Sequence, residues 1–290
     1  MSDTGLVWIR EDFRIENNAA LSYATQNHQN VIAFFIYNHN DYDNKREAQK
    51  WWLSKSLQNF KKDLLYYQIN LQILKGDELD IFSKIKKTDN VSIYWNKIYE
   101  PDVIEKGRKI RDVFIKNNIN FKYFKGNILN EFQEVTKNDK TPFKVFTPFW
   151  RTAEKIYLNL PPNKNYIINK KSKIKSFFKS SITSKDILPK KNWYKKFEKY
   201  WDVSEDNSKK ILRDLIQNKI KNYGTTRDIP SIEGTSKLSP YIKFGQMHVG
   251  TIWKKCNEIK SKGIGYRKYI NELGWREFSH SLINYFPEFL

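Results

Sequence analysis

LVWIREDFR, residues 6–14, decides the fold class of this chain, because a short apolar run passes at once into charged residues. Apolar runs of similar length recur at residues 31–37, 71–74, 91–94 and 121–124, with helix-compatible sequence between them. Five strands joined by four crossovers predict a parallel sheet with helices on both faces and ligands at the carboxyl ends of its strands. The sequence therefore predicts an α/β domain with a Rossmann-like, five-stranded parallel sheet over residues 1–130.

The predicted strands end in polar segments, among them residues 10–14, 38–43 and 96–102. A dinucleotide-binding domain would carry a glycine-rich turn after its first strand, whereas this chain has IREDFR there. Binding of a nicotinamide cofactor is therefore disfavoured.

The 290 residues include 52 Lys and Arg against 32 Asp and Glu, a formal charge of +20. Such a charge attracts polyanions, and nucleic acid is the obvious candidate. An AT-rich coding sequence would give the same excess of Lys, Asn and Ile without any function, so the charge alone leaves both explanations open. Aromatic residues make up 16% of the chain, and they can form stacking surfaces for bases or a flat cofactor as well as ordinary core.

Cysteine content and hydropathy indicate the cellular compartment of the protein. Cys256 is the single cysteine, so no internal disulfide can form, and the N-terminal MSDTG lacks the basic segment and long apolar run of a signal peptide. No window approaches the roughly 20 consecutive apolar residues that span a bilayer. We expect a cytoplasmic protein without membrane insertion. Separately from these features, we expect a monomer.

The strand and helix pattern changes after residue 130. TPFKVFTPFW, residues 141–150, is aromatic and marked by proline, and residues 170–196 are rich in Lys and Ser, so residues 131–200 are predicted to be a long ordered linker. From residue 201 the pattern is helical, with helices expected at 208–223, 240–260 and 265–285. Ser239 is expected to be the N-cap of the second helix and Pro240 its first residue. Residues 201–290 are thus predicted to begin an all-helical domain.

GTSKLSP, residues 234–240, joins a loop to a predicted helix start. Three hydroxyl groups, unpaired backbone N–H groups and the positive end of the helix dipole would meet there, which suits a phosphate. An ordinary Ser-Pro helix cap explains the same residues equally simply, so the segment alone does not decide between the two.

One face of the last predicted helix combines an acid, a large ring and a guanidinium. Glu272, Trp275, Arg276 and Ser279 are spaced i, i+3, i+4 and i+7, which predicts that they share a face. The alternative is an exposed ion pair between Glu272 and Arg276 beside an anchoring Trp. Arg227, taken alone, is equally well explained as a surface charge.

Several motifs together resemble one known family. Tyr223 with Arg227 and Asp228, then GTSKLSP, then NELGWREF are similar in order and separation to the cofactor and substrate region of the DNA photolyase and cryptochrome family. LVWIREDFRIENNAAL resembles the family's opening strand and loop, WNKIYEPD its fourth strand end, and FKVFTPFWR its linker motif. The resemblance covers essentially the whole chain, and the bacterial cyclobutane pyrimidine dimer photolyases are the branch that it resembles most.

The resemblance implies an N-terminal α/β antenna domain, a linker and a helical domain that holds a U-shaped FAD. Arg227 would contact the DNA backbone, while Glu272 and Trp275 would be the catalytic contacts to a flipped pyrimidine pair, Glu272 by hydrogen bonding and Trp275 by packing. Tyr269 stands where some members have Trp. The flavin-binding residues carried over from the motifs are Tyr223, Thr235, Ser236, Lys237, Leu238, Ser239, Tyr269 and Arg276.

The activity implied by the resemblance is light-driven repair of cyclobutane pyrimidine dimers in DNA, by electron transfer from reduced FAD. Extrusion of a poorly stacked, damaged pair would bring it to the flavin. A cryptochrome-type blue-light photoreceptor without repair, or a flavin-free DNA-binding remnant, are the alternatives. A second antenna chromophore, folate or deazaflavin, is possible in this family, and residues 38–43 and 96–102 do not select one.

Complete members of the family continue well past the position of Leu290. We therefore expect a C-terminally truncated chain in which residues 201–290 are an incomplete FAD-binding domain. We also expect the chain as given to bind FAD poorly or not at all, an expectation that a stoichiometric flavin spectrum of the purified protein would overturn.

Overall fold

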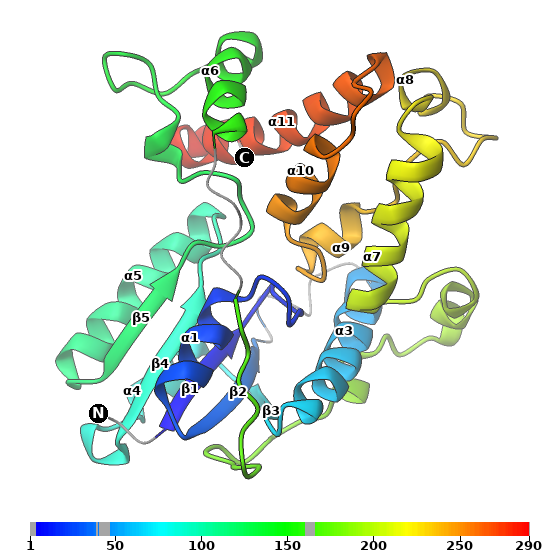
Figure 1. Ribbon diagram of the computed structural model, residues 1–290. Coiled ribbons are helices and arrows are strands. Elements are labelled where there is room, and N and C mark those ends of the chain that lie inside the picture. Colours follow the sequence, from blue (N-terminus) through cyan, green and yellow to red (C-terminus); the bar gives the residue numbers. More distant parts are fainter. Residues whose placement is uncertain (1–3, 39, 41–46, 160–165, 290) are drawn as a thin grey trace.

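The computed structural model describes residues 4–38, 40, 47–159 and 166–289 (Figure 1). Its N-terminal part is a sheet of five parallel strands in the order β3-β2-β1-β4-β5. The predicted α/β class and all five strands are confirmed. The strands are β1 (Thr4–Ile9), β2 (Asn30–Tyr37), β3 (Asn70–Lys75), β4 (Val91–Asn96) and β5 (Asn120–Phe124).

Helices cover both faces of this sheet, which explains why β1 and β2 are apolar at nearly every position. Val7 and Ile9 belong to the core on the side of α1 (Ala19–Asn27) and α3 (Glu47–Tyr66). Leu6 and Trp8 point the other way, into the core beside α4 (Glu78–Ser83) and α5 (Pro101–Lys116). Successive side chains of a strand alternate between faces, so one apolar run fills two cores.

The strand order reverses at β1, which lies between β2 and β4. In open parallel sheets such a reversal opens a crevice at the carboxyl ends of the strands. Here it brings the segment after β1, residues 10–14, next to the segment after β4, residues 97–100.

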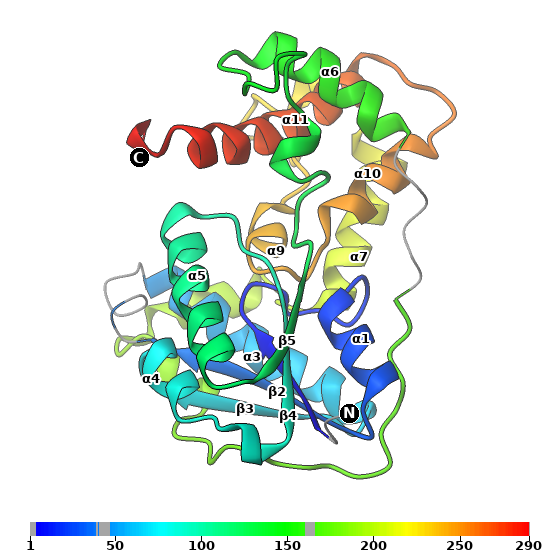
Figure 2. The same ribbon diagram turned by 90° about the vertical axis from the view of Figure 1, so that its left-hand side faces the viewer.

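The C-terminal part is helical (Figures 1 and 2). The last predicted helix is confirmed as α11, and residues 208–223 form α7, a π-helical turn η5 and the first residue of α8. α7 begins earlier than predicted, because Ser204 caps it by accepting a hydrogen bond from Asn207 N. The elements are α7 (Glu205–Asp214), η5 (Leu215–Lys219), α8 (Tyr223–Thr226), α9 (Ser239–Lys243), α10 (Val249–Asn257) and α11 (Ile264–Tyr285), followed by the 3₁₀ turn η6 (Pro287–Phe289).

The helix predicted over residues 240–260 is wrong, because α9 ends at Lys243 and α10 begins only after His248. Gly245, between them, has a φ of 74°, and a Cβ added to it would lie 2.1 Å from the carbonyl oxygen of Glu11. The chain must leave the helix there to approach the segment after β1. Ser239 is also the first residue of α9 and not its cap, a position that Leu238 takes without a side-chain bond.

Residues 131–200 contain the 3₁₀ turns η2 (Phe132–Glu134), η3 (Ser184–Ile187) and η4 (Asn192–Lys199), and also a 13-residue helix, α6 (Phe146–Leu158), that the sequence pattern did not indicate. α6 packs on α11, where Gly274 makes room for Trp150: a Cβ at Gly274 would lie 2.5 Å from the indole ring. We retain the division into residues 1–130, 131–200 and 201–290 as a proposal. Within the described part of the chain, no helix is both long and apolar enough to cross a membrane.

Candidate functional site

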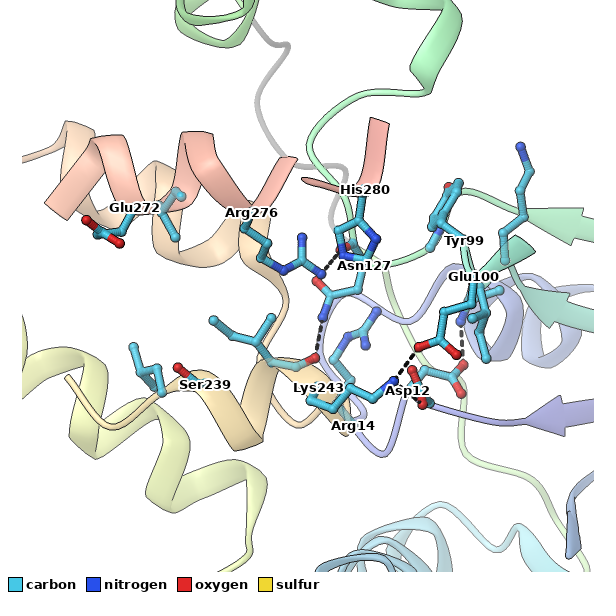
Figure 3. A pocket seen from close by; sticks show the side chains of 18 of the residues that line it. Asp12, Arg14, Tyr99, Glu100, Asn127, Ser239, Lys243, Glu272, Arg276 and His280 are labelled. Carbon is cyan, nitrogen blue, oxygen red and sulfur yellow. Dashed lines mark hydrogen bonds and ion pairs between the residues drawn. The ribbon is translucent and has the colours of Figure 1, made fainter. Parts of the chain in front are cut away.

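A cavity of about 440 Å³, here called the main cavity, lies where the carboxyl ends of β1 and β4 meet α9 and α11 (Figure 3). One wall comes from the segments after β1, β4 and β5, and the other from residues 223–243 and α11. Its volume is within the range of small-molecule and cofactor sites. It is therefore the first place to look for the predicted site residues.

The sheet-side wall is a closed hydrogen-bond network around Asp12. One carboxylate oxygen of Asp12 accepts the backbone N–H of Arg10 at 2.9 Å, and the other accepts the side-chain amide of Asn96 at 2.7 Å. The Asn96 amide also donates to Asn18 Oδ1 at 2.9 Å. Asp12 is 5% exposed, so these charge-assisted bonds fix the segment after β1 against the end of β4.

Arg14 and Glu205 fasten the helical part to the segment after β1. Arg14 is 2% exposed and donates to the carbonyl oxygen of Gly245 at 3.0 Å. Burial lowers the pKa of Arg14, an effect that the nearby Asp12 and Glu205 oppose. The Glu205 carboxylate accepts the backbone N–H groups of Ile15 at 2.6 Å and Glu16 at 3.1 Å. The two walls of the main cavity are thus held at a fixed separation.

Lys243, the last residue of α9, crosses from the helical wall to the sheet wall (Figure 3). Its ammonium group lies 2.7 Å from Glu11 Oε1 and 2.6 Å from Glu100 Oε1. Burial lowers the pKa of Lys243, but the two carboxylates outweigh this effect and raise it above its ordinary value. Lys243 therefore carries a positive charge at the edge of the cavity.

Two of the predicted flavin residues, Tyr223 and Tyr269, form an aromatic corner of the helical wall. Their rings pack edge to face with centroids 5.1 Å apart and an interplanar angle of 88°. Burial raises the pKa of both phenols, so both are neutral. This corner offers a flat apolar surface with two neutral hydroxyl groups.

The loop before α9 brings only part of the predicted phosphate segment to the cavity. Ser236, Leu238 and Ser239 line it, whereas Thr235 and Lys237 are exposed and lie outside its described lining. Lys237 has a φ of 55°, and its side chain pairs with Glu233. Within the described residues, the backbone N–H groups of residues 235–237 have no acceptor. Because α9 has only five residues, the dipole that the predicted long helix would have supplied is smaller than expected.

The spacing predicted that Glu272, Trp275, Arg276 and Ser279 share one face of α11, and the structure shows that they do not. Glu272 and Arg276 line the main cavity, but Trp275 is 46% exposed and stacks on Phe146 of α6, with centroids 3.7 Å apart. At 3.6 residues per turn, Trp275 lies about 60° from Glu272 on the side away from Arg276. Ser279 is exposed, donates to the carbonyl oxygen of Trp275 at 2.8 Å and is absent from the described lining.

The charged residues of α11 pair differently from the simplest sequence alternative. Glu272 pairs with Arg227, whose guanidinium lies over the Tyr223 ring at 5.4 Å from its centroid. This hydrogen bond to Glu272 raises the pKa of Arg227. Arg276 instead donates to Glu277 Oε1 and to the carbonyl oxygen of Asn127, both at 2.7 Å. The structure thus joins Arg227 and Glu272, two predicted substrate contacts from separate motifs.

Sequence reasoning missed several residues of the cavity. Asn127 holds α9 and the loop before α10, because its amide donates to the carbonyl oxygens of Ile242 at 2.9 Å and Met247 at 3.1 Å. His280 also lines the cavity, and burial with help from Arg276 lowers the pKa of His280 to about 4. The spacing from Arg276 to His280, one helical turn, was the only sequence signal for this residue.

Two further cavities lie outside this site. The strand-end cavity, about 410 Å³, is bounded by β1, α5 and Glu78, and it shares Glu11 and Glu100 with the main cavity. Most of residues 38–43, which were predicted to face such a ligand, lie outside the described residues. The acidic cavity, about 570 Å³, contains Asp63, whose pKa is raised to about 6 by burial and by the nearby Glu205 and Asp206.

Comparison with known proteins adds to this geometry. A family model described as DNA photolyase matches residues 5–165. The chain is 28% identical over 295 residues to a deoxyribodipyrimidine photo-lyase of Agrobacterium fabrum, covering 98% of the chain and 60% of that protein. It is 24% identical to cryptochrome-1 of Arabidopsis thaliana, covering 93% of the chain and 40% of that protein. Its structure is similar to that of a bacterial class III photolyase from Agrobacterium tumefaciens, with a TM-score of 0.85 and 25% identity over 99% of the chain and 60% of that protein.

The fold and the site define a class of protein with a five-stranded parallel sheet docked on a helical layer around one cavity. The chain belongs to the DNA photolyase family, because the family model covers more than half of it. It spans about 60% of the length of the photolyases named above.

Proposed function

We propose that the main cavity is the flavin and substrate site of a deoxyribodipyrimidine photo-lyase, which repairs cyclobutane pyrimidine dimers in DNA in a light-driven reaction. The observation that carries the proposal is the convergence of Tyr223, Ser236, Tyr269, Glu272 and Arg276 on one cavity, from segments up to 53 residues apart. The family assignment and the charge of +20 agree with it, since DNA is a polyanion.

The residues around the cavity fit FAD in three respects. Tyr223 and Tyr269 offer an aromatic corner for a flat ring system. Ser236 and Ser239 suit a diphosphate together with the backbone N–H groups of residues 235–237, which have no acceptor among the described residues. In addition, Arg14 Nε is buried in the wall without a hydrogen-bond partner among the described residues, so a ligand that accepts hydrogen bonds would satisfy it. When bound, a reduced flavin supplies on blue-light excitation the electron that splits a pyrimidine dimer.

Of the eight predicted flavin residues, we propose that Tyr223, Ser236, Leu238, Ser239, Tyr269 and Arg276 contact FAD with their side chains. Thr235 and Lys237 would contribute through their backbone N–H groups, because their side chains are exposed and lie outside the described lining. Because Arg276 also donates to Glu277 and to the carbonyl oxygen of Asn127, it would in addition hold α11 in place.

For the substrate, we propose that Glu272 accepts hydrogen bonds from the flipped pyrimidine pair. It must first separate from Arg227, which then becomes available for a DNA phosphate. This exchange couples the arrival of the DNA backbone to the exposure of the Glu272 carboxylate. Trp275 is outside the described cavity lining, so it would pack on the part of the DNA lesion that stays outside the cavity, with the part of its ring that Phe146 leaves exposed.

The strand-end cavity is the proposed place of a second chromophore, a folate or a deazaflavin. It lies at the carboxyl ends of the strands, is separated from the main cavity by the ion pairs of Lys243 with Glu11 and Glu100, and presents the Trp8 ring. One structural neighbour, an archaeal photolyase from Sulfolobus tokodaii, is described with two FAD molecules and with the implication of a novel light-harvesting cofactor.

A blue-light photoreceptor without repair activity is the second candidate. It is favoured by the similarity to the cryptochrome of Arabidopsis thaliana and to a Synechocystis cryptochrome structure, the latter with a TM-score of 0.82 at 19% identity. The two candidates share the flavin site and differ in whether Glu272 and Arg227 receive a DNA lesion.

Binding of lesion-containing DNA separates them. We expect the chain to bind an oligonucleotide with one thymine dimer more tightly than the undamaged strand, and Glu272→Gln to lower this preference by about tenfold, since a hydrogen bond to a charged group contributes about 1.5–3 kcal/mol. Glu258→Gln, at the end of α10 in an exposed pair with Lys255, is the matched control and should retain the preference. Equal affinity of the unsubstituted chain for both strands would exclude the repair function for this site.

A further inference from the structure

The positive charge of the chain is concentrated in residues 166–200, here called the lysine strap. These 35 residues contain 11 lysines and two acids, a formal charge of +9 out of the total of +20. Nearly half of the net charge therefore lies in about an eighth of the chain, mostly outside the helices and strands that build the main cavity.

The lysine strap is an ordered part of the molecule, held along the edge of the sheet. Figure 2 shows the strap passing α1 and running beneath the sheet toward α3. Lys171 N donates to the carbonyl oxygen of Tyr67 at 2.9 Å, and Ser181 N donates to that of Ile73 in β3 at 3.0 Å. The backbone is therefore fixed before any partner arrives, so binding a partner would not have to order it.

Apolar anchors turn the lysines of the strap outward. The backbone N–H groups of Phe177 and Phe178 both donate to Gln72 Oε1 at 3.0 Å, and Phe178 packs on Phe34 of the core with ring centroids 5.0 Å apart. The flanking lysines are exposed: they are Lys170, Lys173, Lys175, Lys179, Lys185, Lys190, Lys191, Lys195, Lys196 and Lys199.

These ten exposed lysines have no ion-pair partner among the residues that the structure describes. The acids of the strap are used otherwise: Asp186 accepts from Thr183, and Glu198 pairs with Lys55. Unpaired ammonium groups at this density repel one another, which is unfavourable for the isolated protein. A polyanion would relieve this repulsion.

Two features favour nucleic acid over another polyanion. Exposed hydroxyl groups, those of Ser172 and Ser180, alternate with the lysines, and Lys with Ser is a usual combination of phosphate contacts. Exposed tyrosines mark both ends: Tyr66 is 70% exposed with Lys170 Nζ 5.0 Å from its ring centroid, and Tyr200 is 73% exposed with Lys199 Nζ at 5.6 Å. Such rings can stack on unpaired bases.

The strap is separate from the main cavity. The described lining of that cavity contains no residue between 128 and 222, and the first half of the strap follows β3, the edge strand farthest from β5 in the sheet order. Contacts made by the strap would therefore not require a lesion or a flavin.

We infer that the lysine strap is a second nucleic-acid surface, which binds the phosphate backbone of DNA without regard to sequence or damage. The inference rests on the proposed function only in taking DNA as the polyanion. The role of the lysine strap would be to hold the protein on undamaged DNA, so that the main cavity stays close to any lesion in the same DNA.

The test compares two variants of equal charge. The strap variant replaces Lys173, Lys175, Lys179, Lys190 and Lys191 with Gln, and the control variant replaces Lys84, Lys86, Lys87, Lys109 and Lys116, exposed lysines of the α4 and α5 region without ion pairs among the described residues. Binding of an undamaged duplex is measured by fluorescence anisotropy in the dark, without flavin, between about 50 and 200 mM salt.

The strap variant should bind at least about tenfold more weakly at the lowest salt, and the slope of log K against log salt should become less steep by about 2–4, because each phosphate contact contributes about 0.9. The control should change the slope by less than about 1. A Lys→Arg version of the strap variant keeps the charge and should bind like the unsubstituted chain, and circular dichroism checks that each variant is folded.

Equal losses in both variants, or no loss in either, would overturn the inference. The inference would also be overturned, in favour of an anionic membrane, if the strap variant lost binding to vesicles of phosphatidylserine and phosphatidylcholine while its binding to DNA stayed unchanged. If the five-residue strap variant fails to fold, the pair Lys173→Gln and Lys175→Gln, both in an exposed stretch, provides the same comparison with Lys86→Gln and Lys87→Gln. Because flavin and lesion are absent, a failed proposal for the main cavity would leave this result unchanged.

Discussion

Gly245→Ala tests how the two walls of the main cavity are joined. Gly245 lies between α9 and α10 with a φ of 74°, and its carbonyl oxygen accepts a hydrogen bond from Arg14 at 3.0 Å. An L-residue in this left-handed region costs about 1–2 kcal/mol. The new Cβ would also lie 2.1 Å from the carbonyl oxygen of Glu11 and 2.6 Å from the Cα of Asp12, so the backbone on one side must move.

Relieving such an overpacked contact typically costs about 1–3 kcal/mol, which gives a total loss of about 2–5 kcal/mol in the free energy of unfolding. In a chain of this size, 1 kcal/mol corresponds to about 2–4 °C in Tm, so we expect Tm to fall by about 4–20 °C. Thermal unfolding followed by circular dichroism measures the change. Loss of the Gly245 geometry should also move Lys243, whose ion pairs with Glu11 and Glu100 cross the same interface.

Gly107→Ala is the matched control. Gly107 lies inside α5, and a Cβ there would meet nothing within 4 Å. Alanine in a helix interior is more favourable than glycine by about 0.5–1 kcal/mol, so Tm should rise by a few degrees. If Gly245→Ala melts within about 2 °C of the unsubstituted chain, the close approach of Gly245 to the segment after β1 is not a real constraint.

Two further predictions concern titrating groups. Asp63→Asn should raise the free energy of unfolding by about 1–2 kcal/mol near neutral pH, because the pKa of Asp63 is raised to about 6 and its charge is therefore unfavourable in the folded state. This gain in stability should disappear as the pH falls to about 4, where Asp63 is protonated in the folded protein. The urea midpoints of the variant and the unsubstituted chain should then coincide. His280→Gln should make the protein less sensitive to acid, because the pKa of His280 is lowered to about 4 and the side chain binds a proton more weakly in the folded than in the unfolded chain. The gain in the free energy of unfolding should be absent above about pH 6.5 and reach at most about 3 kcal/mol near pH 4. Identical pH profiles of the urea midpoint for the variant and the unsubstituted chain would refute this prediction.

The strands could be predicted from the sequence because burial on both faces leaves an unambiguous apolar run. Residues 6–9 and 31–37 are apolar at every position, and both lie within strands. The polar segments after β1 and β4 come together at one edge, where they line the main cavity, for the same reason: a parallel sheet collects its carboxyl ends on one side.

The break between α9 and α10 could not be predicted from local sequence. Residues 240–260 have a helical pattern, and the break depends on Gly245 meeting Glu11, more than 200 residues away. α6 was not predicted for the opposite reason: the chain is helical there, but Pro148 suggested a break in the helix. Pro148 lies in the first turn of α6, where no backbone N–H group is needed for the helix.

On the helical side most of the residues named from the motifs line one cavity, but Thr235, Lys237 and Trp275 are outside its described lining. Trp275 and Glu272 are three residues apart, and only the contact with Phe146 shows that the Trp ring leaves the cavity face. Lys243 and Glu100, 143 residues apart in sequence, form a contact that no local pattern could indicate.

The most direct test of the flavin site is an FAD titration of the chain and two variants, followed by fluorescence anisotropy. Ser239→Trp fills the main cavity from its lining, whereas Ser279→Trp places the same ring on an exposed part of α11 outside the described lining. The account predicts saturable but weak binding, reduced at least about tenfold by Ser239→Trp and unchanged by Ser279→Trp. Stoichiometric binding of FAD by the unsubstituted chain, or equal binding by Ser239→Trp and the unsubstituted chain, would contradict it.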